Sequence, residues 1–187
     1  MMNRVFFLML IFILPVIKSC TRDYSEEQGR HKANKIHDNL ITVDSHTDTP
    51  LRLSRPGTDL TLRSDPRKGG GKIDFPRMTE GGLDGIFFAV FVGQRERTPE
   101  GNEYARTRAL RLFDSIHSQV SRSNDVAEIA LLADDLETIN RKGKKAVFIG
   151  IENGFTIGRD LSMIKSYYDL GARYITLCHT SNNDICD

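Results

Sequence analysis

The stretch that decides the fold is residues 146–179, AVFIGIENGFTIGRDLSMIKSYYDLGARYITLCH. It opens with an apolar run rich in valine and isoleucine, which predicts a buried strand that ends at Glu152. Apolar residues then recur at helical spacing over residues 160–170, and a second apolar run leads to His179. A strand, a helix and a strand in this order predict a crossover unit whose two strands are parallel.

A shorter apolar run, residues 40–43, leads into residues 44–48, DSHTD. His46 and Asp48 are two positions apart, so an extended backbone directs both side chains to the same face. Taken alone, this pair is more typical of a hydrogen-bonded histidine beside a turn than of a metal site. Chemistry in parallel sheets collects at the C-terminal strand ends, however, and Glu152 also follows a strand.

Imidazole nitrogen and carboxylate oxygen are both good donors for zinc. We therefore expect His46 and Asp48 to offer donors for a cation, with Glu152 and His179 at the same edge of the sheet. The alternative for Glu152 is a surface carboxylate or the cap of the next helix. Asp44 is expected to orient the segment by hydrogen bonding rather than to bind metal.

The composition is that of an ordinary globular domain. The chain has 187 residues, of which 39% are hydrophobic, and its formal net charge is +1. Lysine and arginine form no block interleaved with aromatic residues, so the sequence predicts no binding of nucleic acid.

The N-terminus has the pattern of an export signal. Arg4 precedes an apolar run over residues 5–17, too short for a comfortable membrane span, and residues 17–20, IKSC, resemble a bacterial lipobox with Cys20 as the lipidated residue. Lys18 is unusual in a lipobox, which leaves ordinary signal cleavage or an uncleaved anchor as alternatives. The protein is expected to be exported, either as a membrane-anchored lipoprotein or as a periplasmic protein.

The remaining organisation follows from composition and periodicity. We expect a signal peptide over residues 1–20, a polar tether over residues 21–35 and a folded domain over residues 36–187. Within the domain we predict a strand over residues 83–93, helices over residues 98–120 and 133–142, a strand over residues 145–151, and a long loop over residues 52–82.

Other candidate side chains are given structural or solvated roles. His31, His37 and His117 match no ligand pattern and are expected to be solvated. Cys178 is expected to be a small core residue within the last strand. Pairing of Cys178 with Cys186 stays open, because spacing alone does not fix the geometry of a disulfide.

Four blocks of the sequence resemble the membrane dipeptidase family, also called renal dipeptidase-like metallopeptidases. They are residues 43–50, 81–92, 149–154 and 170–183. The resemblance implies an α/β fold that is the N-terminal part of a (β/α)8 TIM-like barrel, incomplete in this chain. It also implies a hydrolase with two zinc ions at the C-terminal mouth of the barrel.

The same resemblance implies roles for individual residues. His46 and Asp48 correspond to ligands of one zinc, and Glu152 to the catalytic carboxylate that bridges both ions. His179 corresponds to a catalytic histidine that binds the substrate and steadies the oxyanion. The implied partners are a dipeptide substrate, a membrane reached through a lipid anchor, and further copies of the chain in a homo-oligomer.

One departure from the family pattern bears on activity. Family members carry two histidine ligands of the second zinc, a substrate-binding arginine and a proton-transferring aspartate on later strands, and a (β/α)8 domain takes roughly 250 residues. We therefore expect a truncated zinc-dependent dipeptidase of low activity. The alternatives are an inactive lipoprotein remnant, a binding module of the same fold, and another metal-dependent amidohydrolase.

Overall fold

A computed structural model describes residues 25–187 of the chain. The described part of the chain divides after Ile36, so that residues 25–36 and residues 37–187 belong to different units. Helix α1 (Glu26–His37) has no buried residue, and it lies in a segment predicted from composition to be a polar tether. The predicted signal peptide and Cys20 lie outside the described residues. No helix among residues 25–187 has the length and apolar character needed to cross a membrane.

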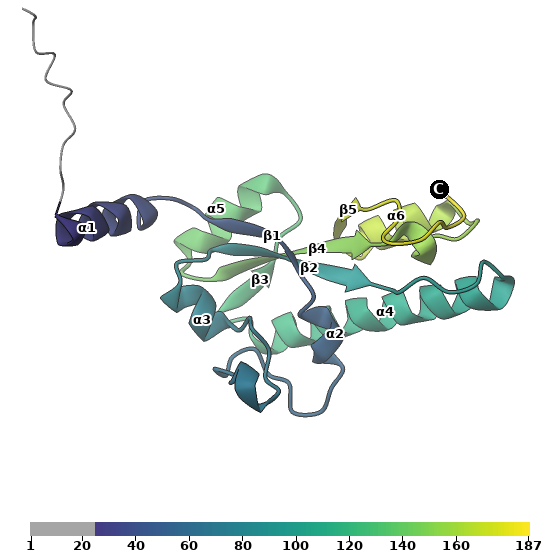
Figure 1. Ribbon diagram of the computed structural model, residues 1–187, viewed down its shortest axis with the longest axis horizontal. Helices are drawn as coiled ribbons and strands as arrows, with labels where there is room; N and C mark the ends of the chain where they lie inside the picture. Colours follow the sequence, from purple (N-terminus) through teal and green to yellow (C-terminus); the bar gives the residue numbers. More distant parts are fainter. Residues whose placement is uncertain (1–24) are drawn as a thin grey trace, which may run out of the picture. The chain divides into compact units, whose positions relative to one another are not determined.

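The second unit is built around a parallel five-stranded sheet (Figure 1). Its main path runs β1–β2–β4–β3, and β5 also pairs with β4. All four strand pairings are parallel, as the crossover unit at residues 146–179 predicts. The strands are β1 (Val43–Thr47), β2 (Gly85–Phe91), β3 (Ala127–Ile129), β4 (Lys145–Glu152) and β5 (Ala172–Ile175).

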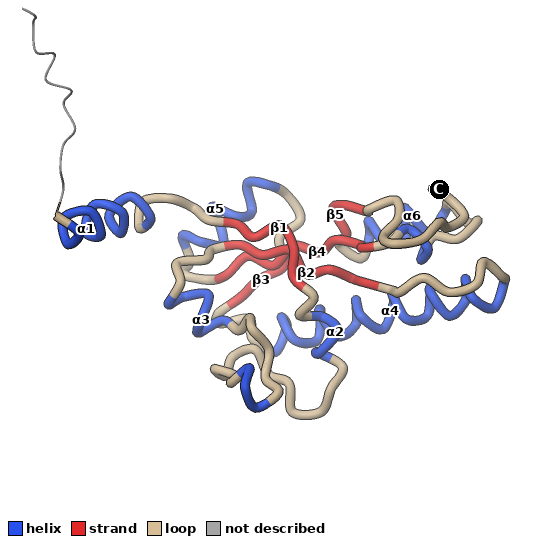
Figure 2. Tube along the Cα trace, in the orientation of Figure 1, coloured by secondary structure: helices blue, strands red, loops and turns tan. Residues whose placement is uncertain are grey.

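Helices connect these strands, as expected of a βα fold (Figure 2). Three of them match the predicted periodic segments: α4 (Pro99–Arg122), α5 (Ala133–Arg141) and α6 (Ser162–Asp169). Thr98 caps α4, because its side chain accepts a hydrogen bond from Gly101 N at 3.1 Å. The shorter elements are α2 (Pro50–Leu53), η1 (Pro66–Lys68), α3 (Phe75–Glu80) and η2 (Gly154–Thr156).

The main core lies between helix α4 and one face of the sheet. Alternate side chains of β2 and β4 point to this face, and they are fully buried against the apolar stripe of α4. The opposite face carries Phe87 and Phe148, whose rings stack with centroids 4.7 Å apart. The residues of the α4 face include Ile86, Phe88, Val90, Val147, Ile149, Ile151, Ala109, Leu112, Phe113 and Ile116.

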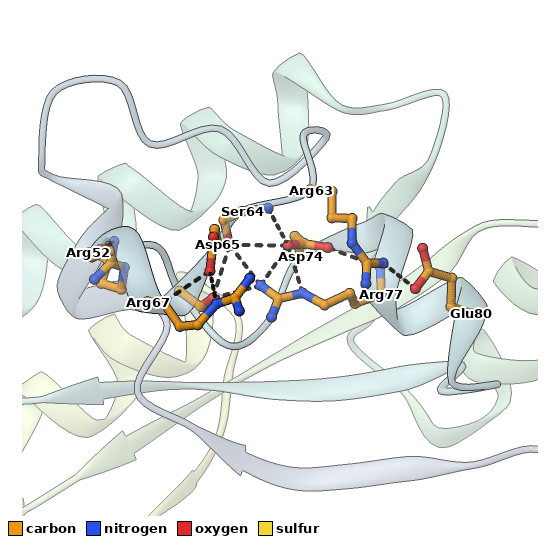
Figure 3. Close-up of polar contacts among 10 residues, drawn as sticks. Arg52, Arg63, Ser64, Asp65, Arg67, Asp74, Arg77 and Glu80 are labelled. Atoms are coloured by element: carbon orange, nitrogen blue, oxygen red, sulfur yellow. Dashed lines mark hydrogen bonds and ion pairs between the residues drawn. The ribbon is translucent and has the colours of Figure 1, made fainter.

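The segment between β1 and β2, predicted as a long loop, is divided by α2, η1 and α3 and tied together by a polar network (Figure 3). Asp74 is 1% exposed and caps α3 by accepting from Arg77 N at 2.9 Å. Its carboxylate also accepts from Arg77 Nε at 3.0 Å and from Ser64 N at 2.9 Å. Burial alone would raise the pKa of Asp74, but these hydrogen bonds outweigh it and hold the pKa below its ordinary value.

The predicted last strand ends early. Strand β5 ends at Ile175, so Cys178 lies in the following loop, is only partly buried, and is not the core strand residue that the sequence predicted. Cys178 and Cys186 are both free thiols. The neighbouring Cys178 thiol raises the pKa of Cys186.

Candidate metal centre

His46 reaches its position through an irregularity in the pairing of β1 with β2. Val43 is opposite Gly85 and Asp44 is opposite Ile86, but Thr47 is opposite Phe88, so the register has shifted by one residue between Asp44 and Thr47. A one-residue shift exchanges the two faces of a strand. With the extra residue, His46 shares the face of Phe87 and Glu152. Without it, His46 would point into the core against α4.

The irregular segment is stabilised locally. Asp44 Oδ1 accepts a hydrogen bond from the backbone N–H of His46 at 3.0 Å, as expected for a residue that orients the segment. Immediately after the strand, Thr47 Oγ1 and Thr49 Oγ1 are 2.9 Å apart and share a hydrogen bond. Pro50 then begins α2, where its missing N–H costs nothing. These contacts place Asp48 at the end of β1.

The structure brings His46, Asp48 and Glu152 together. One ligand atom from each side chain lies within 4.8 Å of the other two. His46 Nε2 is 3.2 Å from Glu152 Oε2 and 3.7 Å from Asp48 Oδ1. One imidazole nitrogen and two carboxylates suit a divalent cation such as zinc, so the donor set fits the metal that the sequence suggests.

The three donors differ in their exposure to solvent. The Glu152 side chain is 15% exposed, whereas those of His46 and Asp48 are 40% and 65% exposed. Glu152 ends the central strand β4, and His46 and Asp48 come from β1, which is two strands away across β2. The cluster is thus held from one side by the most buried strand and open to solvent on the other.

Glu152 contacts a different histidine with each oxygen. Its Oε2 faces His46, and its Oε1 is 3.2 Å from His179 Nε2. The His179 ring also packs on Phe91, with the two ring centroids 5.0 Å apart. Since β5 ends at Ile175, His179 is placed by the following loop and not by a strand end. All four predicted site residues therefore lie in one neighbourhood.

Two buried asparagines anchor the loops beside the cluster. Asn153 follows Glu152 with a positive φ of 79°, a backbone conformation that few residues other than glycine adopt. Its amide donates to Val92 O at 3.0 Å, and its Oδ1 accepts from Asn183 Nδ2 at 3.0 Å. The loop that carries His179 is thereby joined to the end of β4.

Tyr174 contributes a contact that the sequence did not single out. Its hydroxyl oxygen lies 3.2 Å from His46 Nδ1, the imidazole nitrogen that does not face the carboxylates. Burial raises the pKa of the Tyr174 phenol, and the nearby charges of Glu152 and Asp48 raise it further. The phenol is therefore neutral at physiological pH.

The other histidines stay outside the cluster. His31 and His37 are exposed residues of α1, as expected, and His37 Nε2 also forms a hydrogen bond with Gly81 O at 3.0 Å. His117 is only partly exposed, and its Nε2 forms a hydrogen bond with Leu170 O at 2.9 Å, so the prediction of a solvated side chain is wrong for this residue. Among the described residues, only His46, Asp48 and Glu152 form a group with metal-binding geometry.

Comparison with known proteins identifies the family. Residues 30–187 match the membrane dipeptidase family, peptidase family M19. The chain therefore belongs to the membrane dipeptidase family, which confirms the resemblance seen in the four sequence blocks.

The chain is also similar to individual proteins, and the two solved structures among them share its fold. The chain is 31% identical to dipeptidase ataJ of Aspergillus terreus over 172 residues, covering 89% of this chain and 42% of that protein. Among solved structures, the probable dipeptidase PvdM of Pseudomonas aeruginosa matches with a TM-score of 0.75 and 21% identity over 86% of this chain and 40% of that chain. A metallopeptidase of Rhodobacter sphaeroides, liganded with a phosphinate mimic of L-Ala-D-Ala, matches with a TM-score of 0.65 and 23% identity over 76% and 46%.

These matches define how much of the fold is present. The chain spans about two fifths of the length of the first relatives. Its parallel α/β sheet corresponds to the N-terminal part of a TIM-like barrel, as the sequence predicts.

Proposed function

We propose that this chain carries one zinc site of a zinc-dependent dipeptidase, together with the carboxylate that such an enzyme shares between two zinc ions. The observation that supports the proposal is the convergence of His46, Asp48 and Glu152, whose donor atoms lie within 4.8 Å of one another in a member of a dipeptidase family. The remaining donors of a second zinc would come from later strands of the barrel.

Each residue then has a defined task. His46 Nε2 and the Asp48 carboxylate would hold one cation, and Glu152, whose two oxygens face different histidines, would be suited to a bridging role. Bound zinc would lower the pKa of a coordinated water and polarise the carbonyl group under attack. His179 lies beside Glu152, and its imidazole would donate a hydrogen bond to the oxyanion that forms on a bound substrate.

The proposed substrate class is a dipeptide. The similar Rhodobacter structure is liganded with a phosphinate mimic of the dipeptide L-Ala-D-Ala. L-Ala-D-Ala is therefore a suitable first substrate for this protein, and hydrolysis would release two amino acids from the single peptide bond.

The test begins with the natural gene product, whose length is measured by intact mass. Zinc affinity is measured by competition with a chromophoric chelator, and hydrolysis by the release of alanine. We expect Glu152→Gln to lower zinc affinity by at least about tenfold and to abolish hydrolysis. Glu137→Gln is the matched control, because Glu137 is an exposed carboxylate of α5 with 66% of its side chain accessible.

The outcomes separate the proposals. Loss of zinc and hydrolysis in Glu152→Gln alone supports a zinc dipeptidase. Full hydrolysis after removal of zinc by a chelator contradicts the metal mechanism. Zinc binding without hydrolysis contradicts the enzymatic part and favours a metal-holding binding module.

His179 is tested separately from the ligands. His179→Ala should still bind zinc, because His179 contacts Glu152 but is not in the ligand cluster. Its turnover should fall by roughly a hundredfold or more, as expected for a lost contact to the oxyanion. Loss of zinc binding in this variant would indicate that His179 is a metal ligand instead.

A further inference from the structure

Tyr174 reaches the metal cluster because of a second register shift, in the pairing of β4 with β5. Ile149 is opposite Ala172, but Gly150 is opposite Tyr174, so one extra residue is inserted in β5. The insertion turns Tyr174 to the face of the sheet that carries Glu152. Without it, the tyrosine ring would point toward the core against α4.

Gly150 provides the space for the tyrosine ring. A Cβ atom built on Gly150 would lie 2.1 Å from Cζ of Tyr174, so any larger residue at this position would displace the ring. The ring lies across β4 and contacts Phe87 of β2, with centroids 5.4 Å apart. From there its hydroxyl oxygen lies 3.2 Å from His46 Nδ1 of β1, so side chains of β5 and β1 meet above β4 and β2.

We propose that Tyr174 is a positioning residue that fixes the tautomer and the ring orientation of His46. The two imidazole nitrogens of His46 have different environments: Nε2 faces Glu152 and Asp48, and Nδ1 faces the Tyr174 hydroxyl. If Nδ1–H donates to the tyrosine oxygen, the Nε2 lone pair is left for the cation. A residue from β5 thus prepares a ligand of β1 for metal binding.

The neighbourhood explains why this hydrogen bond matters. His46 is on a strand whose side chains are largely exposed, and its own side chain is 40% exposed, so packing alone does not hold the ring. In the metal-free protein the adjacent carboxylates attract a proton on Nε2, which is the tautomer that cannot bind a cation. The tyrosine oxygen opposes this preference, because it can accept a hydrogen bond from Nδ1–H and so stabilises the tautomer that leaves Nε2 unprotonated.

The inference rests on the proposed zinc site and is tested with Tyr174→Phe, which keeps the ring and removes only the hydroxyl. We expect zinc affinity, measured by chelator competition, to fall by about 10- to 100-fold, the usual effect of removing a partner of a metal-bound histidine. Tyr168→Phe is the matched control, because Tyr168 is an exposed residue of α6. The unfolding midpoint of the metal-free protein should change little in either variant.

A second readout reports on the histidine itself. Two-bond nitrogen–proton spectra of protein labelled with ¹⁵N-histidine distinguish the two neutral tautomers without added metal. The fraction of His46 that carries its proton on Nδ1 should be larger in the wild type and in Tyr168→Phe than in Tyr174→Phe. In Tyr174→Phe the population with the proton on Nε2 should increase, which a tyrosine that only fills space would not cause.

The results distinguish this inference from the proposed function. Wild-type zinc affinity and an unchanged His46 tautomer in Tyr174→Phe overturn the role of Tyr174 while the zinc site stands. A wild-type protein that binds no zinc overturns both. Reduced affinity together with the tautomer shift supports the positioning role.

Discussion

Asn183 Nδ2 donates a hydrogen bond of 3.0 Å to Asn153 Oδ1, and both asparagines are almost completely buried. Asn183 also donates to Leu177 O at 2.7 Å, and its own Oδ1 accepts from the backbone N–H groups of Ile185 and Cys186. A single amide therefore organises the loop that carries His179 and fastens it to the residue beside Glu152.

Replacing Asn183 should loosen this loop. Asn183→Ala leaves several buried polar groups without partners, each of which costs about 1–3 kcal/mol, so we expect a loss of at least 2 kcal/mol in the free energy of unfolding. Urea denaturation measures this loss. Asn182→Ala, at an exposed neighbouring position, is the control and should leave the stability unchanged.

A separate prediction follows from the positive φ of Asn153. Asn153→Gly and Asn153→Ala remove the same side-chain hydrogen bonds, but only alanine also opposes the backbone conformation at φ 79°. The alanine variant should therefore unfold at a lower denaturant concentration than the glycine variant. Its free energy of unfolding should be lower by about 1–2 kcal/mol. Equal stability of the two variants would mean that the backbone relaxes freely after Glu152.

The ionised Asp74 side chain should stabilise the folded protein, and this stabilisation should be lost in acid. Its pKa is lowered in the folded state, so the contribution is complete above the unfolded pKa of 3.8 and disappears as the pH falls through the folded value. Asp74→Asn should cost about 3 kcal/mol or more at pH 7, because it leaves Arg77 without its carboxylate.

The difference between the wild type and Asp74→Asn should shrink below pH 4. Urea denaturation at pH 7 and at pH 3 measures it, and Asp169→Asn, at an exposed ion pair of α6, is the control. A difference that is the same at both pH values would contradict the lowered pKa of Asp74.

Zinc should stabilise the folded protein by mass action. At a free concentration 100 times the dissociation constant the gain is about 2.7 kcal/mol, which calorimetry detects as a higher Tm. A chelator should reverse the gain, and His46→Ala should show none of it at the same zinc concentration. A gain that survives in His46→Ala would place the stabilising ion elsewhere on the protein.

The proposed lipid anchor can be tested through Cys20, which lies outside the described residues. Cys20→Ala should move the protein from the membrane fraction to the soluble periplasmic fraction and should abolish labelling by a radioactive fatty acid. Membrane association that persists without labelling would favour an uncleaved apolar anchor instead of lipidation.

The sequence predicted the long elements better than the short ones. Helix α4 and strands β2 and β4 carry unambiguous apolar periodicity, and they form where expected. Strand β3 was missed because its three residues are too few to show alternation. Strand β5 was predicted too long, since the apolar residues after Ile175 belong to a loop that Asn183 holds in place.

The candidate site was found from donor types at strand ends, but its geometry depends on pairing that no local pattern reveals. The register shifts that turn His46 and Tyr174 toward Glu152 arise between strands far apart in the sequence. Tyr174 was overlooked for the same reason, because its path to His46 depends on the absence of a side chain at Gly150.

His46 and Tyr174 are separated by 128 positions in the chain. During synthesis the ribosome therefore releases the first two donors long before the groups that complete and orient the cluster. A cation that meets the nascent chain early finds only one imidazole and one carboxylate on a flexible segment, so its capture is weak and reversible. In the proposed zinc site, the metal would therefore be acquired only after β4 and β5 have joined the sheet.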